Sequence, residues 1–324
     1  TTDISARSEA VLSTDRPYQS VKPAVDFNKL NLAVAWSKFC IEYFTATKGK
    51  VFIVLLITTV AFTLGNLISS IFEGPIANGQ SYLPQTGLIL ELMQEPLAQI
   101  GMLVVIFFTV ELFWNERMVK IAPLVDCTPT QNFTFYLTKL ATALAIGFTL
   151  ILVSIVTAIL FQLSQGEYDI QPQLYLLLFY YSGVPMLLVA LLTLFLQRFA
   201  KVKAIGLLLG LGVFVLNGLA KHILIEHPLT VFAYQPHFIF SQMADTIYHA
   251  EAAHWYNLYW LSITGVLGVL TVKFWQRGSS NVAKQLTKNG KLILACFMSL
   301  SVVSGGYIFY QTNIFNQFTT EKQA

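Results

Sequence analysis

Seven apolar stretches, each near the length that crosses a bilayer, account for much of this chain. A helix needs roughly 20 apolar residues to cross about 30 Å of hydrocarbon. The composition agrees, because 55% of the residues are hydrophobic and 11% are charged, whereas a soluble domain averages about 25% charged residues. The sequence therefore predicts an all-α polytopic membrane protein whose transmembrane helices lie at residues 51–72, 96–114, 140–163, 174–196, 204–219, 255–274 and 292–309.

Positively charged residues lie almost entirely on one side of these stretches. If residue 1 is cytosolic, 18 of the 20 Lys and Arg fall in segments that face the cytosol, and Lys221 and Lys322 are the exceptions. Cytosolic segments of membrane proteins carry such an excess of Lys and Arg. The pattern predicts a cytosolic N-terminus and a C-terminus on the outer side. The net charge of +3 is then a surplus of inward-facing cations rather than a sign of nucleic-acid binding.

The remaining segments divide the chain further. Residues 1–26 are polar and predict a flexible cytosolic lead. Residues 27–49 predict an amphipathic helix in the inner membrane interface, or else a cytosolic helix packed on loops of the chain. A transmembrane domain would cover 50–310, with an outer cap at 220–254, and 311–324 would be an outward-facing tail or linker. The apolar face of the amphipathic helix is expected to contain Leu32, Trp36, Phe39 and Tyr43.

The most specific stretch follows the second apolar segment. It reads Glu111-Leu-Phe-Trp-Asn-Glu116-Arg117 and continues as Val125-Asp126-Cys127-Thr128-Pro129. A carboxylate such as Glu111 is costly where it faces lipid, so we expect it to pair near the inner end of the span, with Arg117 as its partner. By chemistry alone, the stretch can equally be a structural ion pair at a helix exit, which adds little to stability.

The stretch resembles the ABC permeases of the type 2 exporter class. More narrowly, it is similar to the second permease half of bacterial proteins in which a permease is fused to a zinc aminopeptidase of the alanyl-aminopeptidase family. Two departures are visible: Asn115-Glu116-Arg117-Met118 stands where the family has R-E-R and then Asp, and 244–247 replaces a Gly-rich motif. Further matches follow in family order, at Tyr82-Leu-Pro, Leu90-Glu-Leu, Leu196-Gln197, Lys203, Gly206, Glu226-His-Pro-Leu229, 241–249, Leu258-Tyr-Trp260 and 305–314.

The resemblance implies a permease subunit in a bacterial inner membrane. It would couple ATP hydrolysis in a cytosolic ABC ATPase to the export of an unknown substrate, together with a second permease half or a second copy of the chain. The competing interpretation is a membrane anchor that scaffolds a periplasmic zinc aminopeptidase and transports nothing. The loop after the second span would contact the ATPase, and its expected coupling residues are Glu111, Glu116, Arg117, Lys120, Asp126 and Pro129.

All five histidines lie between residues 222 and 254, in the longest outer segment. We expect this cap to contact a periplasmic partner, although it can equally serve only to close over the spans. His249 and His254 are five residues apart and do not form H-E-x-x-H, which disfavours a zinc site there. The sequence contains neither that motif nor a Walker phosphate loop, so we expect no catalytic residue, metal or cofactor in this chain. The expected interface residues are Glu226, His227, Tyr234 and His249.

Overall fold

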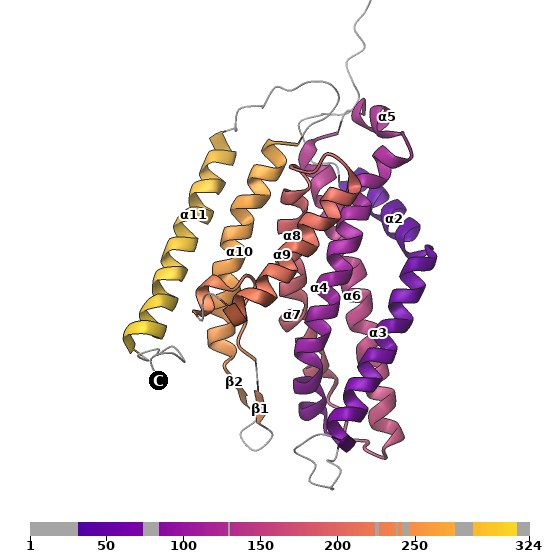
Figure 1. Cartoon of the computed structure of the whole chain (residues 1–324), viewed down its shortest axis with the longest axis vertical. Coiled ribbons are helices and arrows are strands. Elements are labelled where there is room, and N and C mark those ends of the chain that lie inside the picture. The colour runs from indigo at the N-terminus through magenta and orange to yellow at the C-terminus, as the bar shows by residue number, and fades with distance from the viewer. Residues whose placement is uncertain are drawn as a thin grey trace, which may run out of the picture.

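The computed structural model of the chain describes residues 32–73, 84–128, 130–223, 227–237, 239–241, 246–275 and 288–315. Long helices lie side by side, and successive ones run in opposite directions (Figure 1). Two short strands form an antiparallel hairpin in which Ile239 faces Tyr248. The elements are α2 (Leu32–Thr47), α3 (Lys50–Ile68), η1 (Ser69–Glu73), α4 (Thr86–Met118), α5 (Ala122–Asp126), α6 (Asn132–Ser164), α7 (Pro172–Tyr181), α8 (Gly183–Leu196), α9 (Lys203–Ile223), η2 (Pro228–Thr230), β1 (Ile239–Ser241), β2 (Thr246–Tyr248), α10 (Ala250–Lys273), α11 (Lys288–Phe309) and η3 (Tyr310–Phe315).

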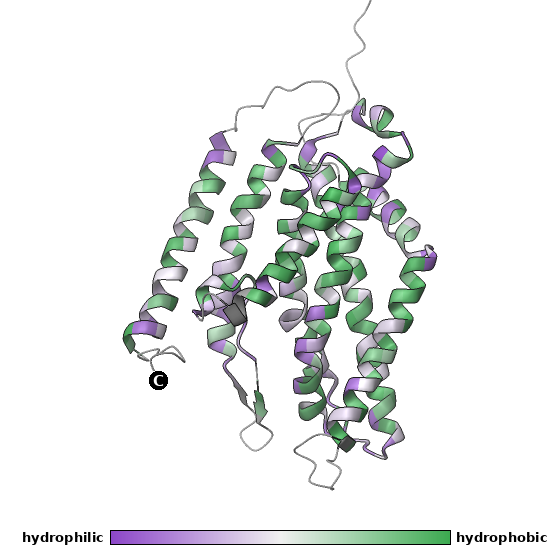
Figure 2. Ribbon diagram, viewed as in Figure 1, coloured by the Kyte–Doolittle hydropathy of each residue, from purple (hydrophilic) through white to green (hydrophobic). Residues whose placement is uncertain are grey.

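The chain is an all-α polytopic membrane protein, as the sequence predicts. Apolar residues cover most of the length of the long helices, and polar residues gather toward their ends (Figure 2). Each predicted span is helical. However, α10 does not meet the length and hydropathy expected of a transmembrane helix, and the apolar part of α9 is shorter than such a helix. Within the described residues, five segments do meet them: Lys50–Phe72, Thr86–Met118, Asn132–Ser164, Pro172–Leu196 and Lys288–Phe315.

The second predicted span is longer than expected, because α4 begins at Thr86 and carries Pro96 inside it. A proline lacks the N–H that would bond the carbonyl four residues earlier, so a helix predicted from sequence is expected to begin or end near it. Here the Asn66 side-chain amide of α3 donates to that carbonyl, Leu92 O, at 2.9 Å. A neighbouring helix thus satisfies the backbone group that the proline leaves free, which permits a helix to continue inside a membrane.

The fourth predicted span is two helices, α7 and α8, that meet at Ser182. Pro185 accounts for the break, because a proline has no backbone N–H to donate to the carbonyl four residues earlier, which here belongs to Tyr181. The Ser182 hydroxyl donates to the Gln94 carbonyl of α4 at 3.3 Å. The broken point is therefore fastened to the central helix of the bundle.

The core lies among α4, α6, α7 and α8, where most of the fully buried apolar side chains gather. At Gly101 of α4, an added Cβ would overlap the terminal methyl of Met186 on α8, so these helices approach as closely as a missing side chain allows. In α9, which the sequence marks as glycine-rich, Gly206 and Gly210 make such approaches, whereas Gly212 has open space around it. Helices α3 and α11 form the two edges of the bundle (Figure 1).

Candidate functional site at the basic end of the bundle

The helix ends that carry Lys and Arg lie together at one end of the bundle, which we call the basic end (Figure 1). It comprises the C-terminal ends of α4, α8 and α10 and the N-terminal ends of α3, α6, α9 and α11. The described cations in or beside these ends are Lys38, Lys48, Lys50, Arg117, Lys120, Lys139, Arg198, Lys201, Lys203, Lys273, Lys288 and Lys291.

A short loop stands out from this end, and we call residues 119–131 the α5 loop. Lys120 adopts a left-handed backbone conformation, with φ of 62°, and turns the chain away from α4. The Ile121 amide then donates to the Glu116 carbonyl at 3.0 Å, which fixes the start of the loop. None of the side chains of α5 is buried. Asp126 ends α5, and Pro129 lies outside the described residues.

The α5 loop and the end of α4 expose large apolar side chains. Leu124 has 73% of its surface exposed, the largest value among them, and the others are Met118, Val119 and Ile121. Such side chains at the end of a bundle, next to charged residues, form the kind of patch that marks a contact with a protein or with a membrane surface.

A cluster of four charged side chains underlies this loop and joins three helices. Glu116 of α4 accepts from Lys38 of α2 at 2.8 Å and from Lys139 of α6 at 3.3 Å. Glu42 of α2 lies 3.4 Å from Lys38 and 3.5 Å from Lys139. The Lys139 side chain is only 2% exposed, and it also donates to the Leu112 carbonyl at 2.7 Å. A buried ammonium surrounded by two carboxylates and a carbonyl is a fully hydrogen-bonded charge.

The predicted pair between Glu111 and Arg117 is wrong. Glu111 instead lies 2.5 Å from Lys203 at the start of α9. The two residues are six positions apart on α4, which at about 100° per residue places them roughly 120° apart around the helix. Side chains on one helix pair at spacings of three or four residues, and at six they diverge.

Arg117 is held by aromatic side chains. Its guanidinium lies 5.0 Å from the ring centroids of both Phe113 and Trp114, within the range of a cation–π contact. The Trp114 indole in turn donates to Gln197 Oε1 at 2.9 Å, and the Gln197 amide donates to the Gly206 carbonyl at 3.2 Å. The end of α4 is thereby connected to the turn between α8 and α9.

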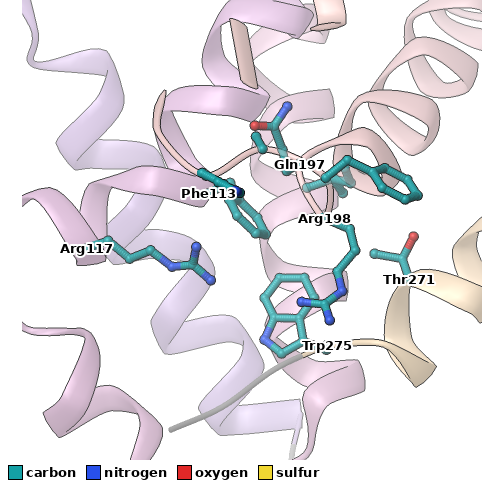
Figure 3. Close-up of a pocket in the computed structure, with 10 residues that line it drawn as sticks. Phe113, Arg117, Gln197, Arg198, Thr271 and Trp275 are labelled. Atoms are coloured by element: carbon teal, nitrogen blue, oxygen red, sulfur yellow. The ribbon is translucent and has the colours of Figure 1, made fainter. Parts of the chain in front are cut away.

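A cavity of about 290 Å³ opens beside Arg117, and we call it the basic pocket. It lies between the end of α4, the turn after α8 and the last turn of α10 (Figure 3). The side chains used below, all of which line it, are Phe113, Arg117, Arg198, Phe199, Lys201 and Trp275.

The described part of the predicted outer cap is folded, and two of its expected interface residues contact the rest of the chain. His227 Nδ1 accepts from the Leu229 amide at 3.2 Å, and His227 Nε2 lies 3.0 Å from Asn313 Nδ2 of η3. Tyr234 packs edge-on against Tyr256 of α10, with ring centroids 5.2 Å apart, and burial raises the pKa of the Tyr234 phenol. These contacts favour a cap that closes over the helices.

The other two expected interface residues are His249 and Glu226, and the structure describes only the first of them. His249 is exposed and adopts a left-handed conformation, with φ of 65°, directly before α10. Glu226 lies outside the described residues. Two further histidines also have separate partners, because His237 lies 3.5 Å from Glu95 and His254 lies 2.6 Å from the Tyr180 hydroxyl. In the part of the chain that the structure describes, no three His, Cys, Asp or Glu side chains gather in a way that could hold a metal ion.

The structure adds residues that the sequence interpretation did not select. Lys139 directly precedes the predicted span at 140–163, but in the structure it is buried in the second turn of α6. The aromatic residues Phe135 and Tyr136, which precede it and are also buried, could have indicated that the apolar helix begins earlier. Comparison of the chain with protein-family models, with curated proteins and with solved structures finds no match.

Proposed function

We propose that this chain is the permease subunit of an ABC exporter and that its α5 loop receives the motion of a cytosolic ATPase. The observation that carries the proposal is the short helix α5, none of whose side chains is buried and which presents Leu124 and neighbouring apolar side chains at the basic end. A protein interface commonly centres on such apolar side chains with a polar rim. A permease without a nucleotide site of its own needs a protruding element of this kind.

Contacts at the base of the α5 loop provide a route for that motion into the helices. Glu116 connects the end of α4 to α2 and α6 through Lys38 and Lys139. Trp114 connects it to the turn between α8 and α9 through Gln197. A displacement of the loop would therefore be passed to four other helices through contacts that have little freedom to relax. Packed side chains and hydrogen-bond networks of this kind carry coupling between distant sites.

The proposed location is a bacterial inner membrane, with the basic end in the cytosol, in keeping with the excess of Lys and Arg in cytosolic segments. Helix α2 supports a position at the cytosolic interface. Its Lys38 and Glu42 turn toward the bundle, whereas Leu32 and Trp36 are 71% and 66% exposed. A helix that exposes its apolar residues and buries its charged ones suits contact with the acyl boundary of a membrane.

A second candidate function is a scaffold for a periplasmic zinc aminopeptidase. Tyr248, the last residue of β2, and His249, directly before α10, are both exposed at the opposite end from α5, and this favours the scaffold, because they can contact a partner there. The two functions differ in which end of the bundle binds a protein.

A photo-crosslinking amino acid at position 124 tests the proposal in native membranes. We expect it to capture a protein that contains a Walker phosphate loop and binds ATP. Position 208 serves as a matched control, because Leu208 is also highly exposed but lies within α9. Capture of lipid alone at position 124, or the same proteins at both positions, would contradict the proposal, and capture of a peptidase at position 248 would favour the scaffold.

A further inference from the structure

We propose that the basic pocket binds the phosphate of an anionic phospholipid headgroup. The proposal does not depend on an ATPase partner, since it rests on the charges, shape and position of the pocket.

The first support is an excess of positive charge in the pocket. Arg117, Arg198 and Lys201 all line it, and within the described residues none of the three forms an ion pair with a carboxylate. The two carboxylates nearest along α4 are already engaged, Glu111 with Lys203 and Glu116 with Lys38 and Lys139. Three cations around one cavity repel one another, and a bound anion would offset that repulsion.

The second support is the arrangement of the guanidinium groups. Arg117 and Arg198 extend toward Trp275 from different sides of the cavity (Figure 3). Phe113 packs edge-on against Trp275, with centroids 5.5 Å apart, and also lies under Arg117. The aromatic floor therefore holds at least one guanidinium in place before a ligand arrives. Arginine side chains so placed bind phosphate oxygens through paired N–H donors.

The third support is size and position. A volume of about 290 Å³ is at the lower limit of small-molecule pockets, which run from roughly 300 to 1,000 Å³, so it suits a headgroup phosphate better than a whole nucleotide. Phe199 lines the pocket and is 63% exposed, and Val202, three residues on, is also exposed. These apolar side chains can contact the first part of an acyl chain. Basic pockets between transmembrane helices at the cytosolic side are suited to anionic lipid headgroups.

Native mass spectrometry of the full chain in detergent tests the proposal with phosphatidylglycerol and phosphatidylcholine of the same acyl chains. We expect tighter retention of phosphatidylglycerol by the wild type. The variant Arg198→Gln/Lys201→Gln should bind it about tenfold or more weakly, because two charge-assisted contacts are lost. Lys288→Gln/Lys291→Gln is the matched control, since it removes the same charge at the start of α11, and it should bind as the wild type does.

Three results would overturn the proposal. These are wild-type retention of phosphatidylglycerol by the pocket variant, an equal loss in the α11 control, and displacement of the lipid by millimolar inorganic phosphate, which would make this a free-anion site. Thermal unfolding establishes whether the pocket variant is folded. If the pocket variant is unfolded, Arg198→Lys is used in its place, because the lysine keeps the positive charge and removes only the paired N–H donors. That variant should then show a smaller but measurable loss of phosphatidylglycerol, and binding equal to the wild type would also overturn the proposal.

Discussion

Replacing Lys139 by methionine should destabilise the folded protein more than any other single charge removal at the basic end. The lysine side chain is 2% exposed and serves Glu42, Glu116 and the Leu112 carbonyl at once. Removing one member of a buried charge network typically costs about 3–5 kcal/mol, because the remaining charges lose their compensation. Lys38 still reaches Glu116 at 2.8 Å and Glu42 at 3.4 Å, so we expect the lower end of that range, about 3 kcal/mol.

Thermal unfolding in detergent micelles measures the effect. A loss of about 3 kcal/mol corresponds to a fall in Tm of roughly 6–12 °C, if the shift per kcal/mol of a large domain applies. Lys203→Met is the matched control, because it also removes one lysine from an ion pair with an α4 carboxylate. In that pair, however, the Lys203 and Glu111 side chains are each 36% exposed. An exposed pair contributes about 0–1 kcal/mol, so its Tm should change by only a few degrees.

A double variant separates charge from packing in the same assay. Lys139→Met/Glu116→Gln leaves Lys38 and Glu42 as an ion pair with no net charge, so the double variant should recover part of the stability lost by Lys139→Met alone. Coupling between contacting residues commonly reaches about 0.5–3 kcal/mol. If Lys139→Met unfolds at the same temperature as Lys203→Met, or if the double variant is no more stable than the single one, the charged cluster does not hold α2, α4 and α6 together.

Three further predictions concern the bundle. Asn66→Ala should lower stability by about 1 kcal/mol in the same unfolding assay, because the carbonyl freed by Pro96 loses its donor; an unchanged Tm would show that another group serves it. Gly101→Ala should cost about 1–3 kcal/mol through overlap with Met186, and Met186→Ala in the same chain should recover part of that loss; no recovery would contradict the proposed contact. In intact cells, a single cysteine at position 165 should react with a membrane-impermeant reagent, and one at position 279 should react only after permeabilisation; labelling of position 279 in intact cells would refute the proposed orientation.

The sequence predicted the positions of the helices well, because the length and hydropathy of a transmembrane segment are local properties. It also predicted a helix before the first span with apolar residues on one face, and Trp36, Phe39 and Tyr43 do form a stacked row in α2. The predicted helix bounds were wrong at two prolines. Pro96, the expected start of the second span, lies inside α4, and Pro185 follows a break that divides the fourth predicted span into α7 and α8. Whether a proline ends a helix inside a bundle depends on contacts with neighbouring helices, which a local sequence pattern does not contain.

The partners of the charged side chains were harder to predict. Glu111 was assigned to Arg117, its neighbour in sequence, and it pairs with Lys203, which is distant in sequence. The basic pocket likewise assembles from three segments that no motif connects. Which cation reaches which carboxylate follows from how the helices cross, so the sequence identified the charged loop at the end of α4 but not its contacts.

ATP hydrolysis tests the central proposal most directly. The chain would be purified with the ATP-binding protein captured at position 124 and reconstituted into liposomes, beside the same ATPase alone. We predict that the wild-type chain changes the rate of hydrolysis severalfold, and that Leu124→Glu abolishes this change while the chain still inserts in the membrane and keeps its Tm. The matched control Leu208→Gln should retain the wild-type rate. Equal rates with and without the chain, or full coupling by Leu124→Glu, would contradict a permease that is driven through the α5 loop.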